Sequence, residues 1–221
     1  MKHLCPRDFR RGEMEENMSD YELIKNQIIN SMKKVDQQYY MPLVAESEET
    51  SHTIKRERNF CYELYHQMRS NTELMCLIED YAFSCEFDKR GHKLFKHGLI
   101  PDFILHRAGK MTLENKDNLL VMEIKVVLNS HTFDGIAKDF NSLSLMLSDY
   151  KYQYGIFILI NHSLEKLQMN IENICKSKEY IKITNKQKKN FSSIDVICLE
   201  SQTSEENIIT LDKLIKGIDH E

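Results

Sequence analysis

Residues 100–127 decide the fold, and they read IPDFILHRAGKMTLENKDNLLVMEIKVV. The stretch holds two apolar runs joined by a polar loop, and each run predicts a buried strand. Asp102 interrupts the first run, and Glu123 and Lys125 interrupt the second. Because side chains alternate between the two faces of a strand, Glu123 and Lys125 emerge on the same face. Buried charges are costly unless they are paired or bind a metal, so these residues predict a functional site.

Purely structural explanations stand beside this interpretation. Asp102 could simply begin its strand, or accept backbone hydrogen bonds after Pro101. Glu123 and Lys125 could lie on the solvated face of an edge strand. The other residues of that face are apolar, however, namely Leu119, Val121 and Val127. Two charges in the middle of an apolar face favour a site.

The composition of the 221-residue chain predicts one domain with an extension, because 41% hydrophobic residues can build a sizeable core. The net charge of -4 does not by itself indicate nucleic-acid binding, although a local basic face would suffice. The six cysteines show no CxxC pair and no zinc-finger spacing, which favours a reducing compartment. The first residues lack the apolar core of a signal peptide, and residues 155–160 are too few to span a bilayer. We therefore expect a cytoplasmic protein without a membrane partner.

A helix is expected over residues 19–40, with Ser19 as its cap and an approximate helical stripe of apolar residues. Pro42 and the polar segment AESEETS then break the pattern. The sequence thus predicts an N-terminal helical extension over 1–52 and a second unit over 53–221. The helix could pack back on that unit, or it could form a homo-oligomer by pairing with a second copy.

The rest of the chain predicts an α/β fold with a mixed central sheet. Helices are expected at 54–71, 72–80, 133–147, 163–176 and 211–218, and strands at 81–87, 100–106, 119–127, 155–161 and 194–199. Three successive strands followed by a helical crossover to a fourth require antiparallel and parallel pairs in one sheet.

The pair Pro101-Asp102, followed by Glu123-Ile124-Lys125 on the next strand, resembles the PD-(D/E)XK nuclease superfamily, which has the restriction-endonuclease-like fold. The resemblance covers about residues 55–199 and implies an αβββαβ core. It also implies a metal-dependent nuclease, an endonuclease or exonuclease, that hydrolyses phosphodiester bonds of DNA in defence against foreign DNA or in repair.

The same resemblance implies a metal centre for Mg²⁺ or Mn²⁺. Asp102 and Glu123 would bind the ion, and the Ile124 carbonyl is a further candidate ligand. Lys125 would orient or help to deprotonate the attacking water, and it would stabilise the transition state. A lysine beside a metal in a partly buried site is expected to have a lowered pKa.

In that superfamily an acid on the first helix often completes the metal shell. Glu63 is the residue expected in this role, which would make it both a metal ligand and part of the catalytic set. Its rivals are Glu79 and Asp80, at the end of the next expected helix, and Glu86 on the first strand.

Positive charge near the substrate would come from two groups of residues. These are Lys89, Arg90, His92, Lys93, Lys96 and His97, and the basic tract Lys176, Lys178, Lys182, Lys186, Lys188 and Lys189. Lys138, on the helix after Lys125, is a further candidate. The basic tract, however, is more typical of a solvated loop than of a dedicated DNA clamp. The alternative function is a catalytically inert nuclease-like module that binds nucleic acid or a protein partner.

Overall fold

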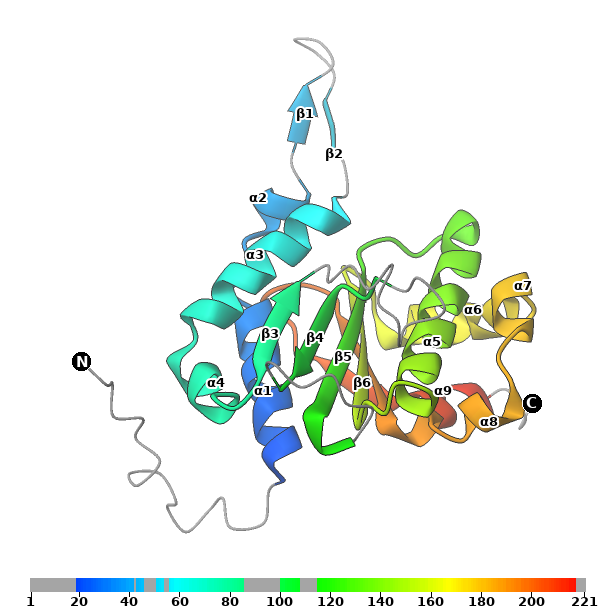
Figure 1. Ribbon diagram of the computed structural model, residues 1–221. Helices are drawn as coiled ribbons and strands as arrows, with labels where there is room; N and C mark the ends of the chain where they lie inside the picture. Colours follow the sequence, from blue (N-terminus) through cyan, green and yellow to red (C-terminus); the bar gives the residue numbers. More distant parts are fainter. Residues whose placement is uncertain are drawn as a thin grey trace.

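The computed structural model describes residues 19–41, 43–45, 51–53, 56–85, 100–107 and 115–217. Its centre is a six-stranded sheet in the order β3-β4-β5-β6-β7-β8 (Figure 1). The strands are β3 (Ala82–Cys85), β4 (Phe103–His106), β5 (Asn118–Lys125), β6 (Tyr154–Ile160), β7 (Ile194–Leu199) and β8 (Asn207–Thr210). A separate two-stranded hairpin, β1 (Leu43–Ala45) and β2 (Ser51–Thr53), projects from the body of the molecule.

The central sheet is mixed, which confirms the predicted α/β class. Strands β3, β4 and β5 pair antiparallel, β5, β6 and β7 pair parallel, and β8 returns antiparallel to β7. The parallel pairs require crossovers, which α5 and α6 provide. Strand β5 is therefore covered on both edges, by an antiparallel neighbour and a parallel one, and its side chains are almost all buried.

Helices cover both faces of the sheet (Figure 1). One face carries α1 (Asp20–Met32), α3 (Glu57–Ser70) and α4 (Thr72–Leu77), and α2 (Gln37–Tyr40) packs against α3. The other carries α5 (Phe133–Ser148), α6 (Leu164–Cys175), α7 (Lys178–Ile181), α8 (Asn185–Lys188) and α9 (Leu211–Lys216). Short 3₁₀ turns occupy Asn115–Asp117, Ser130–Thr132 and Phe191–Ser193. In the described ranges, no helix has the length and apolar character needed to cross a membrane.

The first helix belongs to the core of the sheet. Ser19 caps α1 as expected, since its hydroxyl accepts a hydrogen bond from the Glu22 N–H at 3.3 Å. Ile28 on the apolar face of α1 is completely buried, in the same hydrophobic core as the side chains of β5 and β6. Of the two alternatives left by the sequence, packing back onto the chain is the one the structure shows. The predicted division at residues 52 and 53 falls inside β2.

Polar contacts fix the position of α1 as well. Tyr21 Oη donates to Asp195 Oδ2 at 2.7 Å, and Lys25 Nζ donates to the same oxygen at 2.8 Å. Because Asp195 belongs to β7, this buried pair ties the helix to a strand 170 or more residues later in the chain. Helix α1 thus makes both its apolar and its polar contacts with the sheet of the same chain.

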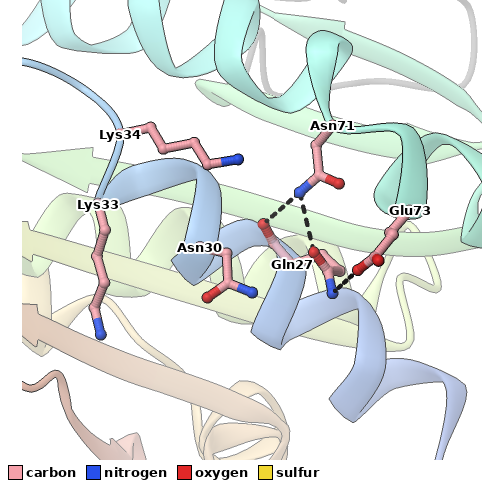
Figure 2. A pocket seen from close by; sticks show the side chains of 6 residues that line it. All are labelled: Gln27, Asn30, Lys33, Lys34, Asn71 and Glu73. Carbon is pink, nitrogen blue, oxygen red and sulfur yellow. Dashed lines mark hydrogen bonds between the residues drawn. The ribbon is translucent and has the colours of Figure 1, made fainter.

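A second polar contact joins α1 to α4. Figure 2 shows Gln27 between Asn71 and Glu73 at a shallow pocket. The Asn71 side-chain amide donates to the Gln27 carbonyl and side-chain oxygens at 3.3 and 3.1 Å, and the Gln27 amide donates to Glu73 at 2.9 Å. These polar side chains form hydrogen bonds with one another. The pocket therefore marks the place where α1 packs against α4.

We predict that Ile28→Ala destabilises the whole sheet domain by about 2–4 kcal/mol, because it leaves a cavity in the shared core. Urea unfolding followed by circular dichroism measures this loss as a lower midpoint of a single transition. The matched control is Asn30→Ala on the exposed face of the same helix, which should change stability by less than about 0.5 kcal/mol. An unchanged main transition in Ile28→Ala would show that α1 is a separate extension.

Candidate active site

The register of the sheet brings Asp102 and Glu123 together. Phe103 of β4 pairs with Met122 of β5, so the antiparallel register continues to Asp102 opposite Glu123. Asp102 Oδ2 accepts a hydrogen bond from the Ile124 N–H at 2.8 Å, and the Asp102 N–H bonds to the Glu123 carboxylate. The backbone contact considered as a structural alternative for Asp102 is therefore present, and it holds the two carboxylates side by side.

The side of the sheet that carries these acids is covered by α5. Val121 shares a strand face with Glu123 and lies in the core formed with α5. A side chain added at Gly135, in the first turn of α5, would lie 3.9 Å from Lys125 Cε. One helical turn later, Asp139 comes from the same face of α5 and reaches Lys125.

Lys125 lies between carboxylates from two different helices. Its Nζ donates a hydrogen bond to Glu57 Oε1 at 3.0 Å and lies 3.1 Å from Asp139 Oδ2. Asp139 Oδ2 is buried, and the Lys125 ammonium is its ion-pair partner. We refer to Glu57, Asp102, Glu123, Lys125 and Asp139 as the acidic cluster.

Burial and like charges raise the pKa values of Glu123 and Asp139, two acids of this cluster. The pKa of Glu123 lies well above its usual value because of burial and the nearby carboxylates of Asp139 and Asp102, which outweigh Lys125. Burial raises the pKa of Asp139 to about 7, although Lys125 lowers it in part. Glu57, Glu123 and Asp139 therefore share one ammonium within the described residues, a donor set that favours an additional cation.

In the metal-free chain the pKa of Lys125 is raised. Burial alone would lower it, but the carboxylates of Asp139 and Glu57 outweigh burial and raise it. The lowered pKa was expected beside a bound metal ion, and for that state it stays a prediction. Lys125 is an ammonium in this arrangement.

The acid that α3 contributes to the cluster is Glu57, at the first position of the helix. Glu63 lies six residues further along α3, where its carboxylate accepts a hydrogen bond from the Gln67 amide at 2.7 Å. At 1.5 Å rise per residue the two acids are about 9 Å apart along the helix. The structure brings Glu57 to Lys125, and the role expected for Glu63 stays a prediction.

Other candidates lie elsewhere. Glu79 and Asp80 are exposed after α4, and Lys138 is exposed on α5 beside the buried Asp139. Glu86 lies outside the described residues, as do the basic residues expected between 89 and 97. In the basic tract, Lys176 pairs with Glu172 and Lys182 with Glu179. The expected loop is not what the structure shows there, since α7 and α8 lie within the tract.

No group of three or more His, Cys, Asp or Glu side chains is arranged to hold a metal ion in the part of the chain that the structure describes. Magnesium keeps several waters, however, and is commonly bound by one or two protein carboxylates. The adjacent pair Asp102 and Glu123 meets that smaller requirement, and the raised pKa of Glu123 marks the place where a cation would be most stabilising.

Comparisons of the chain with protein-family models, with curated proteins and with solved structures find no match. The acidic cluster and the order of the elements that build it are therefore the features that bear on function.

We predict that the metal-free protein loses stability as the pH rises from about 5 to 8. The pKa values of Glu123 and Asp139 are raised on folding, so the folded state holds more protons and deprotonation opposes folding in this range. Glu123→Gln should reduce this loss and stabilise the metal-free protein at pH 8, on the order of 1–3 kcal/mol. Urea unfolding in EDTA at pH 5.5 and 8 measures both effects.

The control for that measurement is Glu165→Gln, which neutralises an exposed acid on α6. It should leave the pH dependence of the wild type unchanged. Equal pH dependence in wild type and Glu123→Gln would mean that the Glu123 carboxyl is not held under charge repulsion.

Proposed function

We propose that this chain is a metal-dependent nuclease that hydrolyses phosphodiester bonds of DNA at Asp102, Glu123 and Lys125. The observation that supports it most directly is the position of two adjacent carboxylates and one lysine at the end of the central strand β5. A helix, three antiparallel strands, a second helix and a parallel strand follow one another around this point. That order is the one expected for a PD-(D/E)XK core.

The carboxylates of Asp102 and Glu123, with the Ile124 carbonyl, are the groups that would hold Mg²⁺ or Mn²⁺. When bound, such an ion would neutralise charge on the scissile phosphate and activate a water molecule. Glu123 supports this assignment, because a buried acid beside other acids is stabilised by a cation more than a solvated acid is.

Lys125 would act next to the bound ion. It would orient or help to deprotonate the attacking water, and its charge would stabilise the negative charge that develops on the phosphate oxygens. Glu57 and Asp139 would hold the ammonium in position from two sides. On this proposal α3 serves the site through Glu57, which positions Lys125, and the metal-ligand role expected of Glu63 stays a prediction.

The second candidate is an inert module that binds nucleic acid or a protein partner. Its support is the satisfied state of two of the key groups: Lys125 is ion-paired with Glu57, and Asp102 accepts the Ile124 N–H. A purely structural network can make such contacts without any reaction.

We predict that Lys125→Ala lowers the cleavage rate of linear and plasmid DNA in Mg²⁺ by on the order of 100-fold or more, because the developing charge loses its positive partner. Binding of Mn²⁺, measured by calorimetry, should persist, and Asp102→Asn should lose both binding and cleavage. Lys138→Ala removes an exposed lysine from α5 and serves as the control, with unchanged cleavage. If the wild type cleaves none of single- or double-stranded DNA or RNA with any of several divalent ions, the inert module is correct.

We also predict that Glu57→Gln weakens Mn²⁺ binding by roughly tenfold, because an acid that positions the site loses its charge. Glu63→Gln, six positions along the same helix, should change the affinity less than about twofold. Calorimetry on the two variants side by side decides which acid of α3 serves the site. A larger effect at Glu63 would restore the assignment made from the sequence.

A further inference from the structure

A basic groove lies at the end of the sheet opposite to the acidic cluster. It has a volume of about 690 Å³ and runs along the residues after α5, the start of β6 and the residues after α8. It adjoins the beginning of β5, because Gln153 in its wall donates a backbone hydrogen bond to Asn118. Lys125 ends the same strand, so the groove and the cluster are roughly 23 Å apart along β5.

The charge of the groove is positive. Three exposed lysines line it, Lys151, Lys186 and Lys189, and none of its walls, as far as the chain is described, carries Asp or Glu. Lys186 Nζ lies 3.1 Å from Asp149 Oδ1 at the margin, and Lys151 Nζ donates to the Ser148 carbonyl at 2.8 Å. An ammonium has three N–H donors, so neither contact uses up the lysine.

The aromatic side chains of the groove are not placed to stack on bases. Tyr152 is only 2% exposed, and the ring of Tyr154 already stacks on Tyr21 with centroids 3.8 Å apart. Asn190 and Ser193 add an amide and a hydroxyl group to the wall. Recognition in this groove would therefore act mainly through charge and hydrogen bonding, because one ring is buried and the other is already stacked on one face.

We propose that this groove binds the phosphate backbone of a nucleic-acid strand without regard to its base sequence. The lysines come from two separate segments, one after α5 and one from α8 onward, so they are spread along an open groove. Such an arrangement suits a row of phosphates better than a single small anion, and lysine binds phosphate as a point charge. The proposal needs no chemistry at Asp102, so it holds or fails separately from hydrolysis.

The test is fluorescence anisotropy with a labelled 20-nucleotide single strand and the corresponding 20-base-pair duplex, in EDTA so that no cleavage occurs. The triple variant K151A/K186A/K189A should bind on the order of tenfold more weakly at low salt. The slope of log affinity against log salt for the single strand should fall by about 2, as expected when three phosphate contacts are lost.

The matched control is K34A/K166A/K213A, which removes the same charge from exposed lysines outside the groove and outside the basic tract. It should bind nearly as the wild type does, and urea unfolding should show both triple variants folded. Equal losses in the two variants, or no loss in the first, would overturn the proposal. So would competition by millimolar inorganic phosphate or AMP that displaces the strand completely, because the groove would then be a small-anion site. A failure of the nuclease proposal would instead appear as absent cleavage with groove binding intact.

Discussion

The structure depends on one electrostatic constraint: the carboxylate of Glu123 is buried inside the fold and surrounded by other acids. The flanking residues on β5, Met122 and Ile124, are completely buried, and the strand has hydrogen-bonded neighbours on both edges. Water cannot solvate the charge there, so its free energy depends on the groups brought to it. Lys125 provides part of this compensation, and Asp139 and Asp102 act against it.

Three separate features of the topology bring these groups to one place. The antiparallel register of β4 and β5 puts Asp102 opposite Glu123, while the crossover helix between the parallel strands β5 and β6 delivers Asp139. The start of α3 supplies Glu57. Each acid arrives through a different backbone path, so a small shift of any one path would separate the cluster. The candidate site therefore depends on the register and the crossover of the mixed sheet, more than on the packing of the hydrophobic cores.

The sequence was most informative where charge interrupted an apolar strand. The pattern of β5 and the strand at 194–199 could be predicted, and the latter has the same bounds in the structure. The continuous helix over 19–40 was wrong, because residues 33–36 leave the helix and Asp36 caps a new one. Strand β8 was missed because its four residues carry no alternating pattern and are held by β7.

Glu57 and Asp139 could not be identified from the sequence for a different reason. An acid in the first turn of a helix is ordinarily explained by its favourable interaction with the helix dipole. The sequence therefore gave no reason to assign Glu57 to the site. Asp139 is next to Phe140 at the apolar stripe of α5, and an acid in that buried position could have indicated a site. The sequence instead favoured the neighbouring Lys138, because a lysine suits a phosphate substrate. Only the tertiary arrangement distinguishes an acid that meets Lys125 from one that meets water.

The acidic cluster has more carboxylates than ammonium groups, and this excess favours a functional site over a structural network. Buried ion pairs maintained for stability alone gain most when charges match and all hydrogen bonds are made, and apolar replacements often serve equally well. Here two buried acids, Glu123 and Asp139, and the partly exposed Glu57 share one ammonium in the described residues. Such a surplus of buried acid lowers the stability of the folded chain at neutral pH, so the fold gains nothing from it by itself. The surplus becomes favourable when a cation joins the cluster, and that is the condition under which a phosphodiester could be hydrolysed there.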